Sequence, residues 1–142
     1  MRVPYETMLA EFERVLKKYG FSAERAHEAA EIFAQNSLAG VFSHGLNRFP
    51  RVVEYPRKGE IDPAAEAVCT ASFGAMERWD GQRGFGPLNA RHAIAADVAA
   101  SEPAEPGREV RCPGMGEHRS RKENMELGIP VAEEKWAEVL AM

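Results

Sequence analysis

A short stretch of the chain, residues 43–51, gathers side chains that can transfer a proton and hold an anion. It reads Ser-His-Gly-Leu-Asn-Arg-Phe-Pro-Arg, and so places His44 close to Arg48 and Arg51. Histidine as a residue type titrates closest to physiological pH, so it can exchange a proton with a reacting oxygen. Arginine is a permanent planar cation that holds a carboxylate through two parallel hydrogen bonds. The stretch therefore predicts a site for a small carboxylate substrate that also carries a carbonyl or hydroxyl group.

The spacing of the two arginines favours an anion site at the start of a helix. A helix that begins after Gly45 places Arg48 and Arg51 three residues apart on one face, close to its N-terminus. That end of a helix attracts anions. Spacing alone leaves a second interpretation open, in which His44 only bonds to the backbone and the arginines are solvated surface charges.

The surrounding sequence resembles one enzyme family. Residues 40–51, which read Gly-Val-Phe-Ser-His-Gly-Leu-Asn-Arg-Phe-Pro-Arg, are similar to the Ser-His-Gly signature of the malate/L-lactate dehydrogenase family that lacks a conventional Rossmann fold. The resemblance runs from near Met1 to about Ala99, and it resumes in the tail at residues 110–114 and 128–136.

The resemblance implies NAD(P)H-dependent reduction of small 2-oxo acids. It implies that His44 is the proton donor and that Arg48 contacts the substrate carboxylate. Ser43 and Arg51 are further substrate-binding candidates. NAD or NADP is the implied cofactor, and a small carboxylate is the implied substrate.

The chain departs from the family pattern between its two matching regions. Family members carry a long central segment there, which forms most of the nicotinamide-binding domain. Here residues 100–109, Ala-Ser-Glu-Pro-Ala-Glu-Pro-Gly-Arg-Glu, stand in its place and have the composition of a linker. We therefore expect an N-terminal helical segment (1–99), a linker (100–109) and a C-terminal segment (110–142) that packs on the first. We also expect that this chain alone binds no nicotinamide cofactor and has little reductase activity.

Two questions stay open at this point, one about the origin of the shortening and one about the function of the chain. The shortening is natural, engineered or an error in the gene prediction, and the sequence does not distinguish these origins. The chain is either the substrate-side part of a reductase or a non-catalytic helical domain for binding or oligomerisation. Loss of a covering domain exposes apolar surface, so self-association into a homo-oligomer, most simply a dimer, is expected.

Composition predicts one small domain and excludes several functional classes. The chain has 142 residues and a net charge of −4, which argues against general nucleic-acid binding. It contains no apolar run of membrane-spanning length, and its first residues lack the apolar core of a signal peptide. Cys69 and Cys112 are far apart, and reduced thiols in a cytoplasmic protein are the expectation for them.

Apolar periodicity predicts that the first half is helical. One amphipathic helix is expected to start at Tyr5 and to stop at Gly20. Ser22 is expected to cap a second, alanine-rich helix over residues 23–39. A third helix is predicted from about Leu46 to Val53 or slightly beyond, and Pro56 is expected to end or kink it.

The second half predicts a small β element followed by more helices. Residues 67–73 and 75–79 read as two strands around a turn. A helix over residues 87–100 is expected to bury Leu88, Ala95, Val98 and Ala99. Further predictions are a strand at 110–112, a helix at 117–127 closed by Gly128, and a helix at 132–140 that buries Trp136, Val139 and Leu140. The predicted fold is mainly α with a small β element (α+β).

Three weaker patterns are assigned structural roles. Gly84-Phe85-Gly86 lacks the third glycine of a phosphate loop, so we assign it backbone freedom at a helix entrance. The histidines at positions 27, 92 and 118 have no spacing typical of a metal site. The basic cluster at 118–122 alternates with glutamates and is interpreted as a solvated surface.

Overall fold

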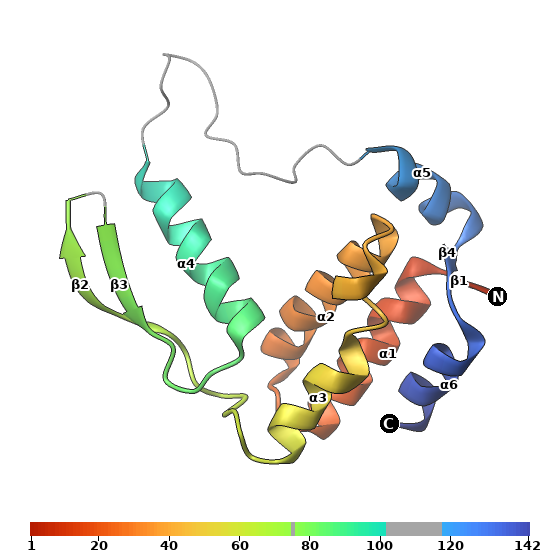
Figure 1. Ribbon diagram of the computed structural model, residues 1–142, viewed down its shortest axis with the longest axis horizontal. Helices are drawn as coiled ribbons and strands as arrows, with labels where there is room; N and C mark the ends of the chain where they lie inside the picture. The colour runs from red at the N-terminus through yellow and green to blue at the C-terminus, as the bar shows by residue number, and fades with distance from the viewer. Residues whose placement is uncertain (75, 102–117) are drawn as a thin grey trace.

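The computed structural model describes residues 1–74, 76–101 and 118–142, and it confirms a mainly α fold with a small β element (Figure 1). Its elements follow in chain order as β1 (Arg2–Val3), α1 (Tyr5–Lys18), α2 (Ala23–Leu38), a 3₁₀ turn (Phe42–His44), α3 (Phe49–Arg57), β2 (Val68–Phe73), β3 (Met76–Asp80), α4 (Gly86–Ala100), α5 (His118–Leu127), β4 (Ile129–Pro130) and α6 (Glu133–Ala141).

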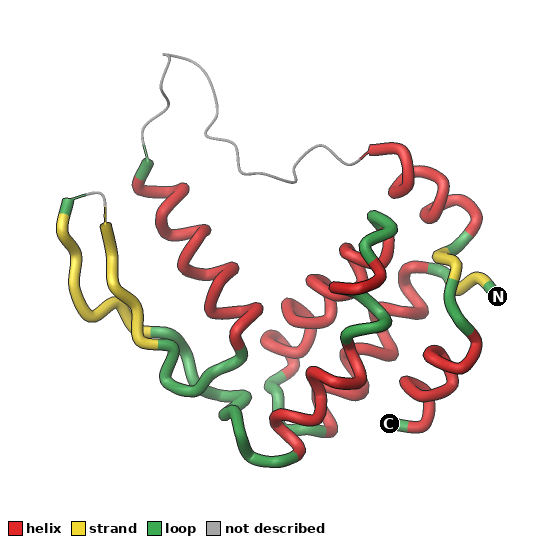
Figure 2. The backbone as a smooth tube through the Cα atoms, in the orientation of Figure 1, coloured by secondary structure: helices red, strands yellow, loops and turns green. Residues whose placement is uncertain are grey.

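Local signals set the ends of the first two helices, as the sequence predicts. Gly20 adopts a φ of +94°, and Phe21 N–H then donates to the Leu16 carbonyl at 3.3 Å, which closes α1. Ser22 Oγ accepts a hydrogen bond from Arg25 N–H at 3.3 Å and caps α2. The two helices lie side by side (Figure 2).

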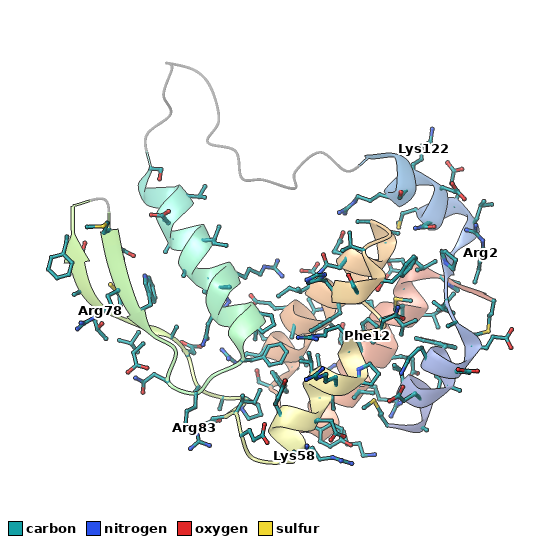
Figure 3. The ribbon with its side chains drawn as sticks, viewed as in Figure 1. Arg2, Phe12, Lys58, Arg78, Arg83 and Lys122 are labelled. Atoms are coloured by element: carbon teal, nitrogen blue, oxygen red, sulfur yellow. The ribbon has the colours of Figure 1, made fainter. Side chains whose placement is uncertain are left out.

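A cluster of aromatic rings fills the centre of the bundle. The rings of Phe12 and Phe49 stack with their centroids 4.0 Å apart, and Phe33 meets Phe49 edge-on at 5.4 Å. Phe85, which precedes α4, meets Phe21 edge-on at 5.1 Å. Phe12 lies in the interior, whereas the labelled arginines and lysines lie at the periphery (Figure 3). The cluster therefore joins α1, α2, α3 and the start of α4.

Two short antiparallel sheets complete the structure. The sequence predicts the β2–β3 hairpin, and the structure confirms it. The other sheet pairs β1 with β4, with Val3 opposite Ile129, and the sequence did not predict it. This second sheet joins the N-terminus to the connection between α5 and α6 (Figure 1).

The tail packs on the N-terminal helices through its apolar and polar side chains. Trp136 and Val139 of α6 are buried, as predicted, and Asn124 Nδ2 of α5 donates to the Leu38 carbonyl at 2.8 Å. Leu140 was expected in the core, but it is 49% exposed, because it lies at the edge of the buried face of α6, about 100° around the helix from Val139. The predicted strand at 110–112 and Cys112 lie outside the described residues.

Helix α4 and helix α3 differ in part from the prediction. Leu88 is buried, but Ala95 is exposed and Val98 is half-buried, because only the first turns of α4 reach α2 and the rest extends along the hairpin (Figure 1). The third helix begins at Phe49 rather than Leu46, since the preceding residues form a turn. It ends at Arg57, one residue after Pro56, as expected.

Within the described residues, no helix combines the length and apolar character needed to cross a bilayer. The same residues contain no group of three histidine, cysteine or carboxylate side chains arranged to hold a metal ion.

Candidate functional site

The end of α2 reverses the chain and directs the Ser-His-Gly motif back onto the helix. Gly40 adopts a φ of +82°, its N–H donates to the Ser37 carbonyl at 3.1 Å, and the Val41 N–H donates to the Asn36 carbonyl at 2.8 Å. This paired arrangement is the Schellman motif, which satisfies the last carbonyls of a helix. It brings the 3₁₀ turn that contains Ser43 and His44 against the last turn of α2.

Gly45 makes the closest contact between the motif and α2. A Cβ atom at this position would lie 2.2 Å from Ser37 Oγ and 3.0 Å from the Phe33 carbonyl oxygen, so only glycine fits there. The buried Ser37 hydroxyl donates to the Phe33 carbonyl at 2.8 Å and accepts from the Leu46 N–H at 2.9 Å. Ser37 and Gly45 together fix the position of the backbone on either side of His44.

The motif borders a pocket of about 520 Å³. Its walls come from α2, α3, the loop before the hairpin and the N-terminus of α4. The lining residues are Ile32, Phe33, Asn36, His44, Arg48, Val52, Tyr55, Ile61, Phe85, Gly86 and Pro87. The described lining therefore includes an imidazole, a guanidinium and an amide, and it includes no carboxylate.

The structure brings three of the four predicted site residues together. His44 and Arg48 both line the pocket, and both are exposed, so a ligand reaches them from solvent. Ser43 Oγ lies 3.0 Å from His44 Nδ1, within hydrogen-bonding distance. Arg51 is exposed and does not line the pocket. Arg48 occupies the N-cap position of α3, so it lies at the helix end that favours anions.

Sequence reasoning missed several residues of the pocket. Asn36 lines the pocket and its Nδ2 donates to the His44 carbonyl at 3.2 Å, which supports the motif from α2. Val52 and Tyr55 follow Arg48 at intervals of four and three residues, a helical spacing that the sequence already contained. Phe85 and Gly86 belong to the Gly-Phe-Gly segment, which borders the pocket as well as opening α4.

The resolved pKa shifts lie away from the pocket. The hydrogen bond between His27 Nδ1 and Glu13 Oε1, 2.7 Å long, raises the pKa of His27 and lowers the pKa of Glu13. Burial raises the pKa of Tyr5, whose hydroxyl accepts from Gln35 Nε2 at 3.0 Å. These groups stabilise contacts of α1 with α2, and none of them lines the pocket.

The pocket does not fit a complete nicotinamide dinucleotide. A dinucleotide carries a pyrophosphate and two riboses, which need several hydrogen-bond donors and cations. The described lining supplies Arg48 and the start of α4, where Pro87 has no N–H to offer, and is otherwise mostly carbon. The described residues of this pocket therefore do not form a complete dinucleotide site.

The comparison with known proteins gives a consistent result. The sequence pattern described as malate/L-lactate dehydrogenase matches residues 3–99. A 2,3-diketo-L-gulonate reductase from Escherichia fergusonii is 45% identical over 102 residues, which are 70% of this chain and 31% of that protein. The chain thus spans less than a third of the length of the curated relatives that it matches.

Solved structures show the same likeness. The sulfolactate dehydrogenase from Methanocaldococcus jannaschii superposes with a TM-score of 0.65 at 28% identity, over 70% of this chain and 29% of that one. The Δ1-piperideine-2-carboxylate reductase from Pseudomonas syringae gives a TM-score of 0.60 at 27% identity, over 70% of this chain and 30% of that one.

Proposed function

Because this chain belongs to the malate/L-lactate dehydrogenase family, we propose that it forms the carboxylate-binding, proton-donating side of a NAD(P)H-dependent 2-oxo acid reductase. The observation that carries the proposal is that His44 and Arg48 line one pocket whose described lining contains no carboxylate. The reaction converts a 2-oxo acid into a 2-hydroxy acid, with reduced nicotinamide as the source of hydride.

Different residues of the pocket bind the substrate and transfer the proton. Arg48 binds the substrate carboxylate, because its guanidinium forms two parallel hydrogen bonds and lies at a helix N-terminus. His44 donates a proton to the carbonyl oxygen through the ring nitrogen that does not face Ser43. Ser43 orients the imidazole through its contact with Nδ1.

The isolated chain is expected to show little reductase turnover. It spans 31% of the length of a matched reductase, and its described pocket does not hold a complete dinucleotide. The assay follows NADH absorbance with pyruvate or 2,3-diketo-L-gulonate. A protein-dependent rate that is abolished in His44→Ala would show that the chain is active alone and would overturn this expectation.

Binding of a small carboxylate tests the site without the cofactor. We expect tartronate to bind in the millimolar range, which corresponds to about −4 kcal/mol, and more weakly at high salt because the exposed ion pair is screened. In an NMR titration, the chemical-shift changes that tartronate causes should be absent in Arg48→Ala. Arg51→Ala is the matched control, since Arg51 is exposed on the same helix but outside the pocket. Equal binding by wild type and Arg48→Ala would refute the proposed carboxylate site.

A second function, assembly through the hairpin, is favoured by one observation. Val68, Phe73 and Met76 of the β2–β3 hairpin are 52%, 66% and 70% exposed, which is unusual for large apolar side chains. A two-stranded hairpin is marginally stable alone, so it gains from pairing with another strand. We propose that the chain forms homo-oligomers through this hairpin. Sedimentation velocity would show a monodisperse monomer at high concentration if this proposal is wrong.

A cytoplasmic location is part of the proposal. Cys69 is exposed, and an exposed thiol is expected to stay reduced in that compartment.

A further inference from the structure

The pocket is larger than a two- or three-carbon acid requires. Its volume of about 520 Å³ falls within the range of roughly 300–1,000 Å³ that is typical of sites for much larger ligands. Arg48 and His44 can hold only the carboxylate and the neighbouring oxygen of a 2-oxo acid. The remaining volume must therefore accommodate whatever follows the carbonyl carbon, or stay filled with water.

The walls beyond the polar end are made of carbon. On α3, Val52 and Tyr55 lie four and seven residues after Arg48, about 6 Å and 10 Å further along the helix axis. On α2, Ile32 lies one turn before Asn36, and Ile61 lines the pocket from the loop between α3 and β2. These side chains offer few hydrogen bonds to a ligand.

The core supplies an apolar base for the pocket, made of two rings inclined at 55° to each other. Phe33 and Phe85 line the pocket, are only 3% and 1% exposed, and have ring centroids 6.3 Å apart. Because both rings are held by the aromatic cluster, this base is rigid. An aromatic group of a ligand can pack against either ring, since aromatic rings pack face to edge or offset on one another.

We infer that this pocket binds carboxylates with an aromatic or branched apolar tail in preference to carboxylates with several hydroxyl groups. The inference rests on the proposed function, because the same guanidinium of Arg48 holds the carboxylate. A polyhydroxylated tail would lose its water and find no partners along Val52, Ile61 and Phe85. An apolar tail loses no hydrogen bonds there and buries carbon surface.

The preference differs from what the name of a close relative suggests. The relative that is 45% identical is named for reduction of 2,3-diketo-L-gulonate, a sugar acid with several hydroxyl groups. In the described part of this chain, only Asn36, His44 and Arg48 offer strong polar side chains at the pocket apart from the Tyr55 hydroxyl. The chemistry of the walls therefore selects a different substrate class for this chain.

Matched ligands test the inference on the whole chain. Calorimetry or NMR compares three carboxylates: pyruvate, benzoylformate, which replaces the methyl group with a phenyl ring, and gluconate. We expect benzoylformate to bind at least tenfold more tightly than pyruvate, and gluconate to bind no more tightly than pyruvate. A tenfold gain is about 1.4 kcal/mol, which burial of about 56 Å² of apolar surface supplies.

Two variants distinguish contacts with the apolar tail of the ligand from contacts with its carboxylate. Ile61→Ala should reduce benzoylformate affinity severalfold and leave pyruvate affinity unchanged, whereas Arg48→Gln should weaken both. Ile94→Ala is the control, because Ile94 is 55% exposed on α4 and lies outside this pocket. Circular dichroism confirms that each variant is folded.

The outcomes distinguish this inference from the proposed function. If pyruvate binds through Arg48 but the phenyl ring adds nothing, the inference is wrong and the proposed function stands. If none of the carboxylates binds, both are wrong. If 1-methylnicotinamide, a ring without a carboxylate, binds as tightly as benzoylformate and independently of Arg48, the apolar walls serve a cofactor ring and the inference is overturned.

Discussion

Gly45 brings the chain closer to α2 than any side chain would allow. Its backbone lies against Ser37 and the Phe33 carbonyl, and the Ser37 hydroxyl bonds to the backbone directly after it. The glycine of the Ser-His-Gly motif therefore has a packing role, and the proposed proton transfer belongs to His44 beside it. A single residue thus couples the stability of the bundle to the geometry of the pocket.

Substitution of Gly45 by alanine should destabilise the protein by about 1–3 kcal/mol, the usual cost of overpacking a core. The new Cβ would meet Ser37 Oγ at 2.2 Å and Ser37 N at 2.8 Å, and the backbone nitrogen cannot move away easily. Urea unfolding measures the change. Gly86→Ala is the matched control, because its Cβ would meet nothing within 4 Å and alanine favours helix. Equal stability of Gly45→Ala and wild type would contradict this account.

At the scale of elements, charged side chains fix α1 against α2 and fix the loop that precedes the β2–β3 hairpin. Glu13 on α1 contacts His27 on α2 at 2.7 Å and Lys17 at 2.9 Å. Arg25 on α2 donates to the Pro63 and Ala65 carbonyls, each at 2.8 Å. The first contact joins α1 to α2, and the second fixes the loop that precedes the hairpin.

The contact of His27 with Glu13 predicts a pH dependence of stability. Glu13 raises the pKa of His27 above its ordinary 6.5, so this contribution is complete below about pH 6.5 and is lost as pH rises through the folded-state pKa. The pKa of Glu13 is lowered, first by its hydrogen bond with His27, so Glu13 stays ionised between pH 5.5 and pH 8 and only the charge of His27 changes. Between pH 5.5 and pH 8, the free energy of unfolding of the wild type should fall by about 0.5 kcal/mol more than that of His27→Gln. This value is appropriate to an exposed pair.

Urea unfolding at the two pH values measures this difference. Glu13→Gln serves as the second half of a double-mutant cycle. If His27→Gln and wild type respond to pH identically, the ion pair contributes nothing to stability.

Replacement of Arg25 by methionine should cost about 1.5–3 kcal/mol, the range for hydrogen bonds of charged groups. Its side chain is only 11% exposed, and its guanidinium holds the loop through two carbonyls as well as Glu66. Arg57→Met is the control, because Arg57 is 55% exposed and contacts only Glu54 in its own helix. Thermal unfolding of both variants decides the point, and similar losses in the two would show that Arg25 has no special role.

The sequence predicts those features of the fold that depend on residues close to one another in the chain. The ends of α1 and α2 follow from Gly20 and Ser22, which act over three to five residues. The start of α3 was misplaced because the Leu46 N–H bonds to the Ser37 hydroxyl nine residues earlier, and no local pattern encodes that contact. His44 and Arg48 are predicted site residues on the basis of residue type and the family resemblance, and the structure places both at one pocket, but the apolar walls depend on how α2, α3 and α4 meet.

At the scale of the whole molecule, the tail is part of one core. Trp136 of α6 is 6% exposed and packs against the N-terminal bundle, and Arg14 of α1 donates to the carbonyls of Val139 and Leu140. Residues 118–142 therefore complete the hydrophobic core that residues 1–101 begin. This arrangement predicts that the described parts unfold together.

Trp136→Ala should destabilise the molecule by about 3–5 kcal/mol, as for other large buried aromatic residues. Leu140→Ala should cost less than about 0.5 kcal/mol, because Leu140 is 49% exposed on the same helix. Circular dichroism during urea unfolding measures both and should show one transition in wild type. Two separate transitions, or equal costs of the two substitutions, would show that the tail is not part of the cooperative core.

The pairing of β1 with β4 also joins two strands that are synthesised at different times. Arg2 Nη1 donates to the Gly128 carbonyl at 2.9 Å across 126 residues of chain, and Val3 pairs with Ile129. At a ribosomal rate of 5–20 residues per second, the partner strand emerges roughly 6–25 s after the first. During that interval Val3 and the surfaces that later receive Trp136 lack their native cover. Apolar surface exposed in this way is prone to aggregation until β4 has emerged and paired with β1.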